Sequence, residues 1–231
     1  MAIFLRTGLF LLTACSTAPL LPPSIVDPVT PPDLQVTIRE RLKEAKANWK
    51  LSNYEAIATR EGDVSCVGSE EGCNALHLVT GHACFRVSNY QCAADHLESG
   101  MQQTETWDFD GLGFNRQKTY LNLLESLRSM QGIMHGEEGK KNTERLLSLT
   151  KAFMILEPKN QVGTFFLSSA QFATIRREGT KEPRRHCQEL GALLSALQKA
   201  GPPSSSIRYQ TYYRQLLSDI AGAKQVLRGC P

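Results

Sequence analysis

The stretch NALHLVTGHACFRVSNYQCAADHLESGMQQ at residues 74–103 indicates the fold. The pair Ser88-Asn89 interrupts two segments of helical composition, so we expect two helices joined by a tight turn. Small side chains at Gly81 and Ala93 allow two antiparallel helices to approach each other closely. The expected helices span residues 74–87 and 89–103.

Helical periodicity continues on both sides of this pair, because apolar residues recur three or four positions apart. The further expected helices are marked by residues 38–49, 120–134, 146–156, 162–175, 187–197 and 207–227. We expect polar loops at 60–73 and 135–141, and breaks at Pro158 and at Gly201-Pro202-Pro203. No segment alternates apolar and polar residues between hairpin turns, so the sequence predicts an all-α fold. Residues 33–231 are expected to form a single domain.

The segment from His77 to Trp107 resembles one tetratricopeptide repeat, a pair of antiparallel helices. The positions that carry the resemblance are Gly81, Tyr90, Ala93, Leu97 and Gly100. The sequence departs from the family pattern at Thr80 and Cys84, where Leu and an aromatic residue are usual, and no proline closes the repeat near Glu105.

Residues 153–158, FMILEP, resemble the end of a second repeat, although Phe153 stands where a small residue is usual. The resemblance implies a degenerate α-solenoid with a curved groove that binds a protein or peptide partner. An array of helical hairpins that shares only the spacing of the family is the alternative. The groove-facing residues that we expect to contact a partner are Asn89, Tyr90, Asp95 and Glu98.

The composition is that of an ordinary globular protein: 231 residues, of which 41% are hydrophobic and 21% are charged. A formal net charge of +3 gives no argument for a nucleic-acid partner.

Residues 1–15, MAIFLRTGLFLLTAC, contain one charge, Arg6, followed by a short apolar run. The run is too short to span a bilayer, and its cationic flank is typical of a secretory signal. Leu12-Thr13-Ala14-Cys15 resembles the lipobox of bacterial lipoproteins. The resemblance implies that a signal peptide of residues 1–14 is removed and that Cys15 is acylated. An ordinary signal peptide followed by a coincidental cysteine is the alternative.

The family's sorting rule implies a location for the anchored chain. Asp after the acylated cysteine favours the inner membrane, whereas Ser16 implies the periplasmic side of the outer membrane. Residues 16–32 contain six prolines in 17 residues, which excludes a helix or a central strand across this segment. We therefore expect residues 15–32 to be a lipidated, proline-rich tether; an ordered strap against the domain is the alternative.

The chain contains seven cysteines, an odd number. With Cys15 acylated, six remain, as an oxidising compartment predicts, and six cysteines allow 15 pairings. A mixture of free buried thiols is the alternative. Proximity in the sequence favours the pairs Cys66–Cys73, Cys84–Cys92 and Cys187–Cys230.

The pair Cys187–Cys230 fits a hairpin of straight helices less well than the other two pairs. Straight antiparallel helices would misalign its two cysteines by roughly 15 Å at about 1.5 Å per residue. We therefore expect the chain to turn back near Gly222 or Gly229; the alternative is that Cys230 does not pair with Cys187.

Candidate chemistry is sparse. Histidines and cysteines cluster within residues 77–96, but their spacing is not that of a zinc site, so we expect no metal, and histidines at the surface or at helix caps. The serine-hydrolase and zinc-protease motifs G-x-S-x-G and H-E-x-x-H are absent from the sequence. We therefore predict neither an enzyme nor a cofactor.

A basic stretch lies between two expected helices and comprises Arg176, Arg177, Lys181, Arg184, Arg185 and His186. It is interpreted as a solvated connection, with contact to acidic lipid headgroups, a glycan or a partner as the alternative.

These features favour a lipid-anchored scaffold of the outer membrane that recruits protein partners in envelope assembly or secretion. The alternative is a periplasmic immunity or inhibitor lipoprotein that blocks a toxin or hydrolase. An envelope enzyme is a third hypothesis.

Overall fold

The computed structural model describes residues 32–60, 62, 64, 66, 72–102, 112–179, 181–203, 206–227 and 230. The chain divides into two units at Pro31 and Pro32. The predicted signal peptide, Cys15 and nearly all of the predicted tether lie outside the described residues, as does the end of the repeat-like segment beyond Gln102.

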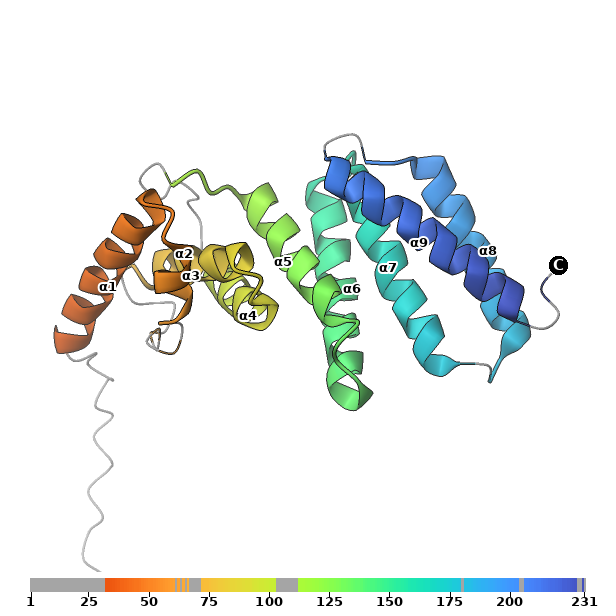
Figure 1. The fold of residues 1–231 in the computed structure, drawn as a ribbon, viewed down its shortest axis with the longest axis horizontal. Helices are drawn as coiled ribbons and strands as arrows, with labels where there is room; N and C mark the ends of the chain where they lie inside the picture. The colour runs from red at the N-terminus through yellow and green to blue at the C-terminus, as the bar shows by residue number, and fades with distance from the viewer. Residues whose placement is uncertain are drawn as a thin grey trace, which may run out of the picture. The chain divides into compact units, whose positions relative to one another are not determined.

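The described residues form helices and contain no strand, so the fold of this part of the chain is all-α (Figure 1). The helices are α1 (Pro32–Lys50), α2 (Tyr54–Ala58), α3 (Cys73–Arg86), α4 (Tyr90–Met101), α5 (Arg116–Met130), α6 (Gly136–Leu156), α7 (Gln161–Glu178), α8 (Pro183–Ala200) and α9 (Ile207–Val226). From α3 onward each helix packs against the next, α1 and α2 pack against α3, and α9 also contacts α7.

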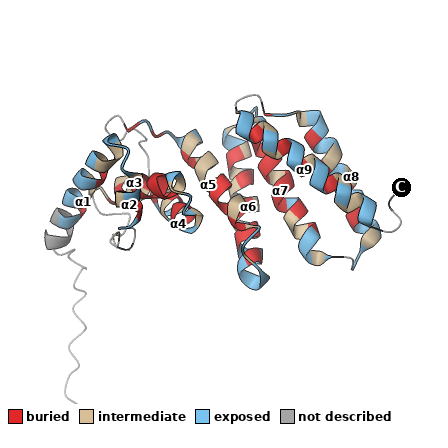
Figure 2. Cartoon of the chain, in the orientation of Figure 1, coloured by how far each residue is buried: buried red, intermediate tan, exposed pale blue. Residues whose placement is uncertain are grey.

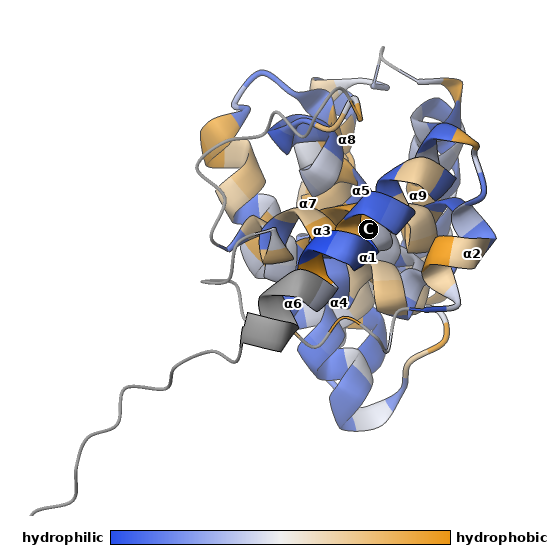
Figure 3. Ribbon diagram, turned by 90° about the vertical axis from the view of Figure 1, so that its left-hand side faces the viewer, coloured by the Kyte–Doolittle hydropathy of each residue, from blue (hydrophilic) through white to orange (hydrophobic). Residues whose placement is uncertain are grey.

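Buried residues lie on α3, α4, α6 and α7, as the colouring of Figure 2 shows, where these helices pack against their neighbours. The largest apolar cluster extends over every helix from α3 to α9 and includes the fully buried Phe153, Phe165 and Phe166. A second cluster joins α1, α2 and α3 to Phe114, before α5. Hydrophobic and hydrophilic stretches alternate along the helices (Figure 3), as expected when each helix buries one side.

Helices α3 and α4 approach each other most closely at two glycines. A Cβ atom on Gly81 would lie 2.7 Å from Leu97 Cγ and 2.8 Å from the backbone nitrogen of Leu97. A Cβ atom on Gly100 would lie 2.7 Å from Leu78 Cγ. The later α3 residue, Gly81, thus meets the earlier α4 residue, Leu97, whereas the earlier Leu78 meets the later Gly100. Helices α3 and α4 therefore run antiparallel as a hairpin, and neither glycine leaves room for a side chain.

The six described cysteines lie in the three pairs that sequence proximity favours. The Cα–Cα distances are 5.8 Å for Cys66–Cys73, 5.8 Å for Cys84–Cys92 and 5.4 Å for Cys187–Cys230. The second pair links the end of α3 to the first turn of α4, and the third links the first turn of α8 to the segment after α9. Of the two expected positions for a reversal, Gly222 lies within α9, which continues to Val226, and Gly229 lies outside the described residues.

The structure also corrects several predicted boundaries. The polar loop expected at 135–141 is wrong: α5 ends at Met130, before the expected Met134, and α6 begins at Gly136. The charged residues of this stretch form the solvent-facing side of the first turns of α6, while Gly139 is buried against the carbonyl of Met134. Helix α2 was not expected, and α1 begins at Pro32, the last residue of the predicted tether, where proline suits a helix N-terminus.

Replacing Gly81 with Ala is expected to destabilise the protein by about 1–3 kcal/mol, because the added methyl group overlaps Leu97. The matched control is Gly191→Ala in α8, where a Cβ atom would meet nothing within 4 Å. This control should stabilise by about 0.5–1 kcal/mol, because alanine favours a helix interior over glycine. Urea unfolding measures both, and equal stability of the two variants would contradict the close approach of α3 and α4.

Candidate functional site

The four residues expected to face a partner lie at the start and on the side of α4, and the structure gives them contacts within the chain. Asp95 and Glu98 bind Arg145 of α6: Arg145 Nη2 lies 3.3 Å from Asp95 Oδ1, and Arg145 Nε donates to Glu98 Oε2 over 3.1 Å. Arg145 Nη2 also pairs with Glu98 Oε2. These partly exposed carboxylates therefore link α4 to α6 through Arg145.

Asn89 and Tyr90 also have structural contacts. The side chain of Asn89 caps α4 by accepting a hydrogen bond from the backbone N–H of Cys92 over 3.3 Å. The half-buried Tyr90 packs against the main apolar cluster, with its ring 6.3 Å from that of Phe85. The structure therefore places the four predicted residues at the start and on one side of α4, where Asn89 and Asp95 are exposed and Tyr90 and Glu98 are half-buried. Their contact with a partner stays a prediction.

His82 is buried on α3, which corrects the expectation of a surface or capping histidine. Thr119 Oγ1 donates to the carbonyl of Asn115, so it accepts from His82 Nε2 over 3.0 Å. His82 Nδ1 then accepts from Asn122 Nδ2 over 2.9 Å, and the ring stacks on Phe114 at 4.1 Å. A neutral ring satisfies this arrangement, which links α3 to α5.

Burial of His82, together with the positive charges of Lys118 and Arg86, lowers its pKa to about 3. His82 therefore remains neutral in the folded protein well below neutral pH, which agrees with its hydrogen bonds to Thr119 and Asn122.

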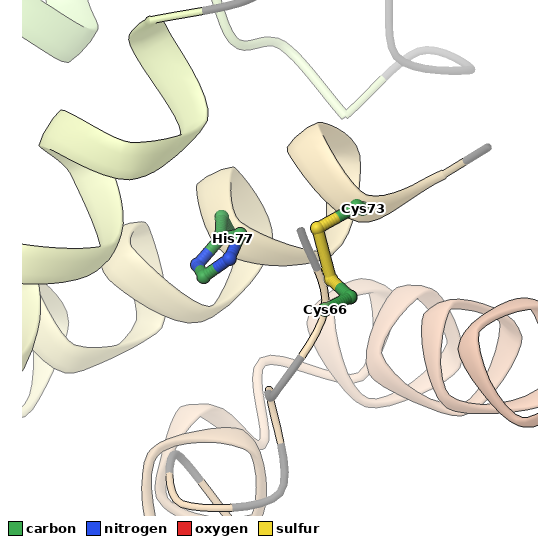
Figure 4. Close-up of side chains that lie close together, drawn as sticks. All are labelled: Cys66, Cys73 and His77. Atoms are coloured by element: carbon green, nitrogen blue, oxygen red, sulfur yellow. A yellow bond between two sulfur atoms is a disulfide. The ribbon is translucent and has the colours of Figure 1, made fainter. Parts of the chain in front are cut away.

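One group of three potential metal-ligating side chains occurs among the residues that the structure describes, at Cys66, Cys73 and His77 (Figure 4). The sulfur atoms of Cys66 and Cys73 are bonded to each other, so neither provides a thiolate. Nδ1 of His77 lies 2.9 Å from Nδ1 of His96. Burial lowers the pKa of both histidines, that of His96 to about 4, so the pair packs as neutral rings beside the disulfide.

The basic stretch between α7 and α8 divides into two parts. Arg185 pairs with Glu178, Glu182 and Glu189, and the buried His186 lies 2.9 Å from the carbonyl oxygen of Gly179 and 3.0 Å from Glu178 Oε2. The interpretation as a solvated connection is therefore wrong for His186, because the ring is enclosed by these acceptors. Arg176 and Arg177 instead face a cleft.

This cleft, the arginine cleft, lies where α5, α6, α7 and α9 are neighbours (Figure 1) and has a volume of about 490 Å³. Pockets of this size bind small ligands or the side chains of a partner. The residues that decide its chemistry are Arg128, Gln131, His135, Arg176, Arg177 and Asp219.

Two aromatic rings constrain the guanidinium of Arg128 in the arginine cleft. Its guanidinium carbon lies 5.1 Å from the ring centre of Phe165 and 4.4 Å from that of Tyr212. Among the described residues, the buried Arg128 Nε and Gln131 Nε2 have no hydrogen-bond acceptor. The sequence signalled Arg176 and Arg177 as part of a basic stretch, but Arg128 lies alone within a helical pattern and gave no such signal.

Comparisons with family models, with curated proteins and with solved structures find no match to this chain. Within the described part of the chain, no helix has the length and apolarity that crossing a membrane requires.

The depressed pKa of His82 makes stability depend on pH. An unfolded histidine takes up a proton below about pH 6.5, whereas folded His82 does so only near pH 3, so stability falls as the pH falls between these values. Between pH 7 and pH 5 the free energy of unfolding of the wild type should fall by about 2 kcal/mol more than that of His82→Gln. Urea unfolding at both pH values measures this loss.

The control is His135→Gln, which changes an exposed histidine and should retain the wild-type dependence on pH. If His82→Gln and the wild type lose the same stability between pH 7 and pH 5, folded His82 is not held neutral.

Proposed function

We propose that this chain is a lipid-anchored binding or scaffold protein on the periplasmic side of the bacterial outer membrane. In this role it recruits protein partners in envelope assembly or secretion and does not act as an enzyme. The anchor is the acylated Cys15, which follows the lipobox-like Leu12-Thr13-Ala14.

The observation that carries this proposal is the pairing of the cysteines. Three disulfides use six of the seven, so Cys15 has no cysteine left within the chain to pair with. An even disulfide set suits an oxidising compartment, and a single remaining cysteine directly after an apolar run suits acylation.

The close packing of neighbouring helices supports the binding role. The hairpin of α3 and α4 approaches closely at Gly81 and Gly100, and α6 and α7 approach closely at Gly163, where a Cβ atom would lie 2.7 Å from Met154 Cγ. Close pairs stacked on their neighbours are the arrangement of tetratricopeptide-like repeats, which leave extended surfaces for partners.

The buried titratable groups of the described residues support binding over catalysis, because they connect helices. Glu125 of α5 pairs with Arg208 and accepts from the hydroxyl of Tyr209 over 3.3 Å, both from α9. Burial raises the pKa of Glu125, which the positive charge of Arg208 opposes. This pair links α9 to α5.

Metabolic labelling with radioactive palmitate tests the anchor in bacterial cells that produce the full chain. The wild type should be labelled and Cys15→Ser should not, because acylation requires the thiol. Ser16→Asp is the matched control for location: it should keep the label but move to the inner-membrane fraction. An unlabelled wild type contradicts the proposed anchor.

A pull-down with the acylated protein tests the scaffold role. Several subunits of one envelope assembly should be recovered together. Recovery of one secreted hydrolase or toxin alone contradicts the scaffold and supports the inhibitor role instead.

A further inference from the structure

We propose that the arginine cleft binds an acidic segment of the protein partner, with carboxylates held between Arg128 on α5 and Arg176 and Arg177 on α7. This inference rests on the proposed recruitment of a protein partner and adds the chemistry that recognises it. It commits to Asp or Glu side chains of a peptide as the ligand.

The distribution of charge around the cleft favours an anionic ligand. Elsewhere among the described residues, Arg60, Arg145, Arg185 and Arg208 each pair with at least one glutamate. The cleft is lined by Arg128, Arg176 and Arg177, and none of these three arginines makes an ion pair within the described ranges. Of the described residues that line it, Asp219 is the one carboxylate and His135 the remaining titratable side chain. The cleft therefore carries an excess of positive charge.

Arg128 and Gln131 provide donors that no described protein group satisfies. Both Arg128 Nε and Gln131 Nε2 are buried, and a buried donor without an acceptor costs about 1–3 kcal/mol. The rings of Phe165 and Tyr212 hold the guanidinium of Arg128 in place before a ligand arrives. A carboxylate is well matched to this group, because a guanidinium donates two parallel hydrogen bonds to its two oxygens.

Arg177 is positioned by α6 on the other side of the cleft. Its Nη2 donates to the carbonyl of Gly139 over 2.9 Å and to Thr143 Oγ1 over 2.6 Å. Arginine has five N–H donors, so these bonds orient the guanidinium and leave further donors for a ligand. The neighbouring Arg176 is exposed and lies 5.8 Å from the ring centre of Phe172.

The lining favours a peptide over a lipid headgroup. Met134, Phe172 and Leu216 line the cleft together with the arginines, so it offers apolar surface beside the charges, as a peptide segment requires. Between Cys15 and α1, which begins at Pro32, the sequence has 16 residues with five prolines, and a polyproline segment of this length would measure about 50 Å at roughly 3.1 Å per residue. A tether of this length allows the cleft to meet partners away from the headgroups.

Fluorescence anisotropy of labelled hexaglutamate with the detergent-solubilised full chain tests this inference. Hexaglutamate should bind, hexaglutamine should not, and added salt should weaken the binding. The double variant Arg176→Gln/Arg177→Gln should bind about 10-fold or more weakly, because each change removes hydrogen bonds to a charged group. The exposed Arg176→Gln alone should weaken binding with unchanged far-UV circular dichroism, which separates recognition from folding.

The matched control is Arg184→Gln, which removes the same charge from an exposed position of α8 outside the lining of the cleft. It should change affinity less than about 2-fold, since the field of a distant exposed charge is screened. Equal losses in Arg184→Gln and Arg176→Gln, or no binding of hexaglutamate by the wild type, would overturn the inference.

Two further probes separate the sources of negative charge. If millimolar inorganic phosphate displaces hexaglutamate, the ligand is a phosphate and the peptide assignment is overturned. If the wild type binds phosphatidylglycerol vesicles and the double variant does not, the ligand is a lipid headgroup and the peptide assignment is likewise overturned. If the wild type carries palmitate and the double variant still recovers the partners, the inference fails while the proposed function stands. If hexaglutamate binding depends on the arginines but Cys15 carries no palmitate, the proposed function fails while the anionic site stands.

Discussion

The close approach of α3 and α4 is the constraint on which the surrounding structure depends. Gly81 and Gly100 leave no room for a side chain against Leu97 and Leu78, so the two helices share one contact surface. This spacing places Asp95 and Glu98 of α4 against Arg145 of α6. Arg145 therefore links the hairpin to α6, which itself packs against α5 and α7 and lines part of the arginine cleft.

Polar groups inside this helical array work mainly as connections between helices. His82 joins α3 to Thr119 and Asn122 of α5, and Glu125 joins α5 to Arg208 of α9. Because an unsatisfied polar group in the interior is costly, each connection restricts how its helices can be displaced. The guanidinium of Arg128 packs against the rings of Phe165 and Tyr212, and its Nε has no acceptor among the described residues.

The predictions from sequence succeeded where the signal was local. Helical periodicity and the breaks at Pro158 and at residues 201–203 located most helices, because a helix is built from contacts three or four residues apart. The prediction of a polar loop at 135–141 was wrong, because the solvent-facing side of a helix N-terminus has the same composition as a loop. The contacts that the expected partner residues make within the chain were not predicted, because Asp95 pairs with Arg145, 50 residues away, which no local pattern indicates.

The sequence by itself determined the all-helical composition of the described part, the odd number of cysteines and the lipobox-like signal, because each depends only on the order of neighbouring residues or on a count. Only the tertiary structure decided which charges are paired. Glu125 of α5 pairs with Arg208 of α9, whereas Arg128, Arg176 and Arg177 line one cleft with a single carboxylate among its described lining residues. The physical reason is that ion pairing and burial depend on which helices become neighbours, and this depends on packing across the whole helical array.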